Sequence, residues 1–200
     1  DLPVHDPLPR LRIVLSCTQH PGNIGSTARA MHNMGLSDLV LLTPRHFPDP
    51  QATAMAAGAE SVLDKARVVQ TLEEAVGDCG WVVGASARPR HLGDEPLTPW
   101  AAAERAVALT AEAPVALVFG CERTGLTNEE IERCHAVTMI PSNPNYSSLN
   151  LAQAVQVLAY ELRKAALPNV PKMASKHEHP WYAPPKAEDM ERFYEHMERV

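Results

Sequence analysis

Three short segments of this 200-residue sequence combine glycine, small polar residues and arginine in patterns suited to holding a ligand. The first, HPGNIGSTAR at residues 20–29, is a glycine-rich turn that ends at Arg29. The second, LVFGCERTGL at residues 117–126, contains two glycines that allow the backbone to approach a ligand closely. The third, IPSNPNYSSLNL at residues 140–151, fixes a loop with two prolines before small polar residues begin a helix.

Each segment, taken alone, also has an ordinary structural explanation. Arg29 falls away from the helical face that Ile24, Ala28 and Met31 form, so it can be a solvated surface residue. Residues 117–126 can be a plain turn between a strand and a helix. Serine and asparagine at the start of a helix are mostly N-caps. A functional interpretation therefore depends on the three segments occurring together.

Several common catalytic and ligand-binding motifs are absent from the sequence. Gly22 and Gly25 lack the third glycine of the dinucleotide-binding fingerprint, and no G-x-x-x-x-G-K-[ST] phosphate loop occurs. Residues 84–88, GASAR, end in arginine where a nucleophile elbow needs glycine. The nine histidines and the acids show no metal-ligand spacing such as H-E-x-x-H, so we expect no metal site.

The elements that must position the three segments are strands and helices in alternation. Near-continuous apolar runs indicate strands that are buried on both faces of a parallel sheet. We expect strands at residues 11–17, 39–43, 68–69, 81–86, 115–120 and 136–141, and helices at residues 24–34, 50–57, 72–76, 99–112, 128–133 and 149–166. Thr98 and Thr127 are expected N-caps, and Glu130 completes a capping box with Thr127. The pattern predicts an α/β fold, a mainly parallel sheet covered by helices on both faces.

The predicted helix at residues 149–166 is apolar on more than one side. One stripe is formed by Leu151, Val155, Leu158 and Leu162, and a second by Ala154 and Val157. Such a helix is typical either of packing between a sheet and a second subunit or of burial within one large core.

The chain divides into three parts by composition. Residues 1–166 carry the alternating pattern and are the expected folded domain. Residues 167–186 are rich in proline without any period, which is typical of an extended linker. Residues 187–200 have the pattern of an amphipathic helix that stops without a C-cap, so we expect the truncated start of a C-terminal helical extension.

Composition favours a cytoplasmic protein. No run of about 18 apolar residues occurs, so no membrane span is expected, and the first ten residues lack the apolar core of a signal peptide. The four cysteines are scattered, which is typical of reduced thiols rather than a disulfide framework.

In order and spacing, the segments N-x-G-x-x-x-R, LVFGxExxGL and IPxNPxxSSLNLAxAVQ resemble the three signature motifs of the SPOUT methyltransferase superfamily. The third motif and its continuation NLAQAVQVLAYELR are similar to those of tRNA 2′-O-methyltransferases of the TrmJ type. The resemblance covers residues 11–166 and implies a C-terminal trefoil knot, which general topology rules would not predict. It also implies a homodimer.

The resemblance implies methyl transfer from S-adenosylmethionine to the ribose 2′-hydroxyl of nucleotide 32, cytidine or uridine, in the tRNA anticodon loop. By motif, the residues around the cofactor would be Ala85, Ser86, Ala87, Gly120, Ile140, Ser147, Ser148 and Leu149. Arg29 is the residue to which a base role is usually given, but a guanidinium stays charged. We expect it instead to hold a phosphate bidentately and lower the pKa of the hydroxyl, while Ser148 and Asn23 orient the ribose.

RNA contacts are expected in loops that follow strands. Tyr146 can stack on a splayed base, or it can simply pack against its neighbours. His20, Arg88, Arg90 and His91 can meet phosphates, although they can equally be ordinary surface residues.

Three alternatives to this function stay open. The enzyme can methylate another tRNA site or rRNA. It can be an inactive module that binds RNA or cofactor, although Arg29, Ser148 and Asn150 are all present. A nucleotide hydrolase is remote because no phosphate loop occurs.

The formal net charge of −6 argues against a nucleic-acid partner, because lysine and arginine drive phosphate binding. The acids are unevenly spread, however: residues 1–45 carry a net charge of +1, whereas residues 46–165 carry −6. A homodimer would join two of these less acidic N-terminal segments. We therefore expect weak, salt-sensitive tRNA binding rather than none.

Overall fold

The computed structural model describes residues 5–88, 95–167 and 185–199. The chain divides into two compact units, Asp1–Pro168 and Asn169–Val200. Most of the predicted linker, residues 168–184, lies outside the described residues. In the second unit the predicted amphipathic helix is α8, Ala187–Glu198, and its side chains are exposed.

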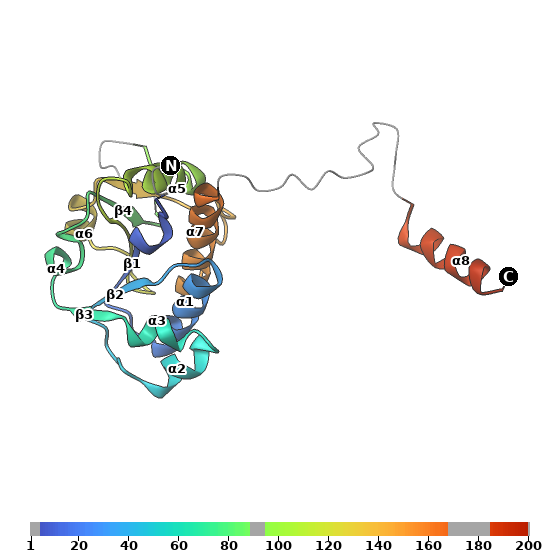
Figure 1. Cartoon of the computed structure of the whole chain (residues 1–200), viewed down its shortest axis with the longest axis horizontal. Coiled ribbons are helices and arrows are strands. Elements are labelled where there is room, and N and C mark those ends of the chain that lie inside the picture. Colours follow the sequence, from blue (N-terminus) through green and yellow to red (C-terminus); the bar gives the residue numbers. More distant parts are fainter. Residues whose placement is uncertain (1–4, 89–94, 168–184, 200) are drawn as a thin grey trace. The chain divides into compact units, whose positions relative to one another are not determined.

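The first unit contains a six-stranded parallel sheet with the strand order β3-β2-β1-β5-β4-β6 (Figure 1). The strands are β1 (Leu11–Ser16), β2 (Asp38–Leu42), β3 (Arg67–Val69), β4 (Trp81–Ala85), β5 (Val115–Phe119) and β6 (Ala136–Thr138). In the sheet register, Leu15 of β1 is paired with Leu41 of β2 on one side and with Phe119 of β5 on the other. The loops that follow β1, β2 and β5 therefore meet at one edge of the sheet.

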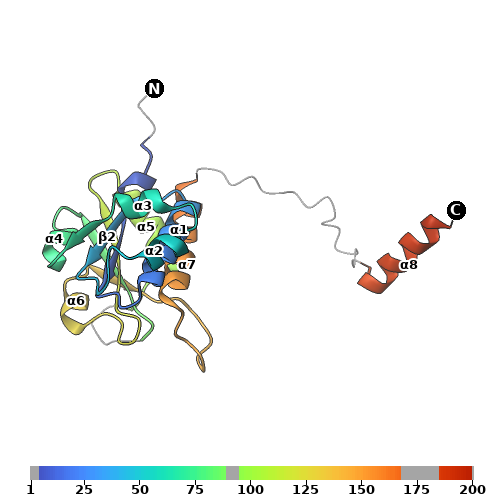
Figure 2. The ribbon, with the colours of Figure 1, turned by 90° about the horizontal axis from the view of Figure 1, so that it is seen from below.

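Helices cover both faces of this sheet, which confirms the predicted fold class (Figure 2). One face packs against α1 (Pro21–Asn33), α2 (Pro50–Ala56), α3 (Glu60–Asp64), α5 (Pro99–Leu109) and α7 (Leu151–Ala166). The other packs against two five-residue helices, α4 (Leu72–Val76) and α6 (Asn128–Glu132). Successive residues of β1 enter different cores: Ile13 and Leu15 the first, Val14 the second. This alternation explains why the central positions of these strands are apolar on both faces.

Side-chain caps set where several helices begin. Thr98 accepts a hydrogen bond from Ala101 N, and Thr127 forms a complete capping box with Glu130, so both predicted caps are confirmed. Asn150 caps α7 in the same way, with Gln153 as its partner. The predicted start of that helix at residue 149 was therefore two residues early, because the cap itself is not helical.

Other boundaries differ from the predicted ones for local reasons. Helix α1 begins three residues earlier than predicted, with Pro21 in the first turn, where its missing N–H is not needed. Strand β6 ends at Thr138 instead of residue 141. The sequence pattern gave no sign of α3, which is only five residues long and has no side-chain cap, nor of the 3-10 helix Leu8–Arg10.

A buried ion-pair cluster fastens the amino end of β1. Arg12, 5% exposed, donates to Asp38 of β2 at 2.8 Å, to Asp78 at 2.6 and 3.0 Å, and to the carbonyl oxygen of Ala75 at 2.8 Å. The hydrogen bond from Arg12 holds the pKa of Asp78 below its ordinary value. This cluster joins β1, β2 and the end of α4, and it lies at the edge of the sheet opposite the motif loops. Of the helices in the described residues, none is long and apolar enough to cross a membrane.

Candidate active site

The three motif segments meet in one hydrogen-bond network at the carboxyl edge of the sheet. Glu122, three residues after the end of β5, accepts hydrogen bonds from the backbone N–H of Gln19 at 3.1 and 3.0 Å and from that of His20 at 3.1 Å. Asn23 on α1 also donates to Glu122, at 3.2 Å from Nδ2, and accepts from Asn150 Nδ2 at 3.1 Å. One residue of each motif thus contacts a residue of another.

Glu122 is the centre of this network, although it was not among the predicted site residues. Its burial raises the pKa, but the N–H groups of Gln19, His20 and Asn23 stabilise the carboxylate and lower the net pKa below the ordinary value. A carboxylate held in this way is a poor proton acceptor. Its role is therefore to fix Asn23 and the turn before α1. The position of this acid within the segment LVFGCERTGL was the sequence signal that could have identified it.

Two small adjoining cavities lie next to the network. Their volumes are about 120 Å³ and about 70 Å³, and they share Ser86, Ala87, Leu149 and Ala154. All eight residues expected around a cofactor line one or both of them: Ala85, Ser86, Ala87, Gly120, Ile140, Ser147, Ser148 and Leu149. These residues come from the last position of β4 and from the loops after β4, β5 and β6. The chain therefore brings together residues that are far apart in sequence.

The two cavities differ in the chemistry of their walls. The smaller one is bounded mainly by Ala85, Ala87, Ile140, Leu149 and Ala154, so it suits a flat apolar group. The larger one has charged groups, Arg88, Glu122 and Arg123. Internal hydrogen bonds hold the loops in shape, from Ser86 Oγ to the carbonyl oxygen of Arg88 at 3.1 Å and from Ser142 Oγ to that of Ser147 at 2.8 Å.

Two motif glycines are required by packing within the chain itself. A Cβ atom at Gly120 would overlap the backbone of Gly125 and Leu126, because the loop folds back with Gly125 N donating to the Cys121 carbonyl oxygen at 2.8 Å. A Cβ atom at Gly25 would overlap the carbonyl oxygen of Ala52 on α2. The immediate reason for both glycines is therefore close backbone packing.

The remaining predicted residues are spread around this edge. Ser148 is exposed and lines the larger of the two small cavities, as does Arg88. His20 precedes α1 and is exposed, and the side chain of Tyr146 is 83% exposed. Arg90 and His91 lie outside the described residues.

Arg29 does not reach either small cavity from its position on α1. It lies six residues after Asn23, so the two are about 9 Å apart along the helix axis and on different faces. Its side chain is exposed, and within the described part of the chain it has no hydrogen-bond or ion-pair partner. Within a single chain, Asn23, Ser148 and the cavity residues therefore lie at one site, whereas Arg29 lies away from it.

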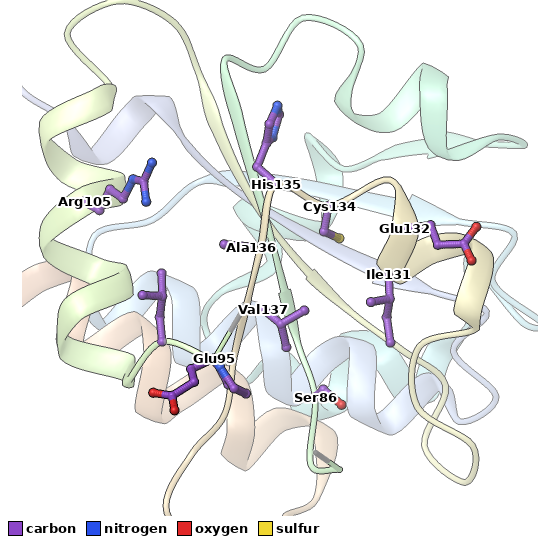
Figure 3. Close-up of a pocket in the computed structure, with 11 residues that line it drawn as sticks. Ser86, Glu95, Arg105, Ile131, Glu132, Cys134, His135, Ala136 and Val137 are labelled. Atoms are coloured by element: carbon purple, nitrogen blue, oxygen red, sulfur yellow. The ribbon is translucent and has the colours of Figure 1, made fainter. Parts of the chain in front are cut away.

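A larger hollow of about 490 Å³ lies over β6, and its charged side chains do not converge (Figure 3). Arg105 from α5 and Glu132 from α6 stand on opposite sides of the strand. Arg105 also lies over the ring of Trp81, 5.1 Å from its centroid. His135 Nδ1 accepts the N–H of Val82 at 2.9 Å. These contacts are structural, and only Ser86 is shared with the smaller cavities.

Among the described residues, no group of three or more His, Cys, Asp or Glu side chains could hold a metal ion. The four cysteines are free thiols, and burial raises the pKa of Cys79 and Cys134 to about 11. One of the thiols, Cys121, lines the larger of the two small cavities, where its Sγ donates to Glu122 Oε2 at 3.8 Å. The site therefore consists of hydroxyl, amide, carboxylate and guanidinium groups and one thiol around small cavities.

Comparison with known proteins gives a consistent set of matches. Residues 10–160 match the model of the SpoU rRNA Methylase family. A Sodalis glossinidius protein named tRNA (cytidine/uridine-2′-O-)-methyltransferase TrmJ is 52% identical over 193 residues, which are 96% of this chain and 75% of that protein. A probable methylase family protein from Haemophilus influenzae is 46% identical, with a TM-score of 0.76 over 96% of this chain and 78% of that one. The crystal structure of TrmJ from Z. mobilis is 42% identical, with a TM-score of 0.72 over 76% and 68% of the two chains.

Proposed function

The chain belongs to the SpoU rRNA methylase family, and we propose that it transfers a methyl group from S-adenosylmethionine to a ribose 2′-hydroxyl of tRNA. The target we propose is nucleotide 32 of the anticodon loop, a cytidine or a uridine, in the cytoplasm. The observation that carries the proposal is the network of Glu122, Asn23 and Asn150 beside the cavities. The 52% identical relative, named for the same reaction class, supports it.

The residues around the two small cavities fit S-adenosylmethionine. The apolar slot between Ala85, Ile140 and Leu149 suits an adenine ring, and the wider cavity has polar groups for the remainder of the molecule. When bound, the cofactor supplies a methyl group on a positively charged sulfur, so no metal is needed to create an electrophile. Glu122, the one carboxylate among the described residues that line these cavities, adds negative charge near this cation.

The protein must position the ribose 2′-hydroxyl, which is a weak nucleophile, and stabilise the negative charge that develops on its oxygen. We propose that Ser148 and Asn23 orient the ribose, with Asn23 held in place by Glu122 and Asn150. S-adenosylmethionine would supply the methyl group in exchange for its sulfonium bond, and the part of this chain would be to hold the hydroxyl oxygen towards that group while the hydroxyl proton passes to solvent. Arg29 would hold a phosphate and lower the pKa of the hydroxyl through its positive charge.

Because Arg29 lies outside both cavities of its own chain, we propose that the enzyme is a homodimer in which Arg29 of a second copy completes the site. The same proposal includes the trefoil knot. It also divides the chain into a catalytic domain of residues 1–166, a linker and a C-terminal extension. The exposed position of Arg29 is consistent with it.

A second candidate is methylation of rRNA or of another tRNA nucleotide, which the rRNA description of the matched family favours. Methyl transfer to purified tRNA and rRNA, with the modified nucleotide mapped, distinguishes the two. An inactive binding module would give cofactor or RNA binding without transfer.

The cofactor assignment has its own test. Ala154 lines both small cavities, so Ala154→Leu should fill them and weaken S-adenosylmethionine binding at least about tenfold. Ala152→Leu, on the same helix but outside both cavities, is the matched control. Equal calorimetric affinities for the two variants would contradict the assignment.

A further inference from the structure

The loops after β1 and β2 are fastened together at the carboxyl edge of the sheet. Cys17 N donates to the carbonyl oxygen of Leu42 at 2.8 Å, and Cys17 Sγ lies 3.1 Å from Thr43 Oγ1. Both Cys17 and Thr43 have positive φ, 54° and 43°, so each strand ends in a sharp turn. Arg45 N then donates to the carbonyl oxygen of Thr18 at 3.0 Å. The two loops therefore form one unit.

Arg45 is attached to this unit by its side chain as well. Its Nη1 donates to Gln19 Oε1 at 3.3 Å, while Gln19 Nε2 donates to the carbonyl oxygen of Cys17 at 2.8 Å. The backbone N–H of Gln19 is one of the donors to Glu122. Gln19 therefore links the two residues: its side chain accepts from Arg45, and its backbone N–H donates to Glu122 at the centre of the candidate active site.

The positive charge of Arg45 is not neutralised by an acid in the described ranges. Its side chain is exposed, and Gln19, a neutral amide, is its one side-chain partner there. Arg12 is the opposite case, because Asp38 and Asp78 neutralise it at the far edge of the sheet. Most donors of the Arg45 guanidinium therefore remain available to an anion.

The charge around Arg45 favours a polyanion. Exposed Arg88 and Arg123 line the cavity next to the network, and exposed His20 precedes α1. The nearby Asp49 is engaged as the N-cap of α2, where it accepts from Gln51 N at 2.8 Å. Two further carboxylates at this edge are engaged within the chain: Glu122 accepts from Gln19 and His20 N–H groups, and Glu130 accepts from Ser16 Oγ and Thr127 N. The exposed arginines therefore leave positive charge on this edge of a chain whose net charge is −6.

We propose that Arg45 binds a backbone phosphate of the RNA loop and thereby fixes which nucleotide enters the site. This inference rests on the proposed function. A planar guanidinium binds phosphate bidentately, and contacts to the backbone set register without reading sequence. Arg45 is thus a positioning residue on the RNA side of the site. It touches neither the cofactor cavities nor the reacting hydroxyl.

The test compares Arg45→Ala and Arg45→Lys with the full chain and with Arg10→Ala. Arg10 precedes β1 at the opposite edge, and its one side-chain hydrogen bond within the described residues is to the carbonyl oxygen of Glu112, so its removal should leave RNA binding unchanged. For Arg45→Ala we expect KM for tRNA to rise about 5- to 20-fold, kcat to change less than about twofold, and the slope of log affinity against log salt to fall by about one. Arg45→Lys should keep the slope but not the full affinity.

A purely structural role would give a different result. In that case Arg45→Ala would lower the melting temperature and kcat while the salt slope stayed that of the unsubstituted chain, and the inference would be wrong. Filter binding to a synthetic tRNA anticodon arm provides a readout independent of methylation. If the chain binds this RNA but transfers no methyl group, the proposed function fails while the Arg45 effect is still measured. If Arg45→Ala binds the RNA as tightly as the unsubstituted chain, or if neither binds, the inference is overturned.

Discussion

Asn23 and Asn150, 127 positions apart in the chain, share a hydrogen bond of 3.1 Å. The same Asn150 side chain uses its oxygen to cap α7 by accepting from Ala152 N at 2.9 Å. One side chain therefore both starts the last helix of the domain and holds the residue that Glu122 also fixes. Folding of α7 and assembly of the candidate active site are coupled through this one amide.

The two roles of Asn150 can be separated by substitution. Asn150→Asp keeps the oxygen that caps α7 but loses the N–H that Asn23 accepts, so we expect near-normal stability and methyl transfer reduced about tenfold or more. The matched control is Thr98→Ala, which removes a cap from α5 away from the site and should cost about 1 kcal/mol with normal activity. Thermal unfolding and kcat measured on both variants check this. Normal activity in Asn150→Asp would show that the Asn23 contact is unimportant.

Glu122 gives a prediction for pH. Its pKa is lowered in the folded chain, so the unfolded state binds the proton more tightly and the carboxylate adds stability above its ordinary pKa. That stability should be lost as pH falls through the folded pKa, below about 4.3. The difference in unfolding free energy between the unsubstituted chain and Glu122→Gln should therefore grow from strongly acidic pH towards about pH 4.5 and stay constant above it. A difference that is independent of pH would contradict the carboxylate's role.

Gly25 should be intolerant of a side chain for a reason unrelated to the cofactor. A methyl group there would overlap the Ala52 carbonyl oxygen and force α2 away from α1, which should cost about 1–3 kcal/mol or more. Gly22→Ala is the matched control in the same helix, because its Cβ would lie 3.4 Å from the nearest atom, an ordinary contact. Chemical denaturation of Gly25→Ala and Gly22→Ala compares them. Equal stabilities would mean that α1 and α2 can separate freely.

The proposed homodimer can be tested by mixing inactive variants. If Arg29 acts on the cavity of a second copy, Arg29→Ala and Ser148→Ala chains should each be inactive alone. Mixing them should restore about a quarter of the activity, because half of the dimers would contain one intact site of two. If both residues act within one chain, every site in the mixture is defective and no activity returns.

The sequence allowed prediction of the fold class because its signals are local and redundant. Apolar runs of strand length, the Thr98 and Thr127 caps and the periodicity of α7 each indicated their elements independently. The elements that were missed gave weak signals: α3 has five residues and no side-chain cap. Boundaries shifted where a cap or a proline, such as Asn150 or Pro21, decided the first helical residue.

The sequence allowed prediction of those site residues that lie within the three motifs. All eight predicted cavity residues line the two small cavities, yet spacing alone could not show that Glu122 would join Asn23. That contact depends on β1 and β5 being neighbours in the sheet, a long-range pairing of strands about 100 residues apart. Arg45 was missed for the same reason, since it belongs to none of the motifs and reaches the site only through β2 beside β1.

The most direct test of the account is methyl transfer to tRNA that lacks a single hydroxyl group. The chain is incubated with labelled S-adenosylmethionine and with two tRNAs that differ only at nucleotide 32, one with ribose and one with 2′-deoxyribose. We expect incorporation of label into the first tRNA and none into the second. Equal labelling of both, or label that maps to another nucleotide, would contradict it.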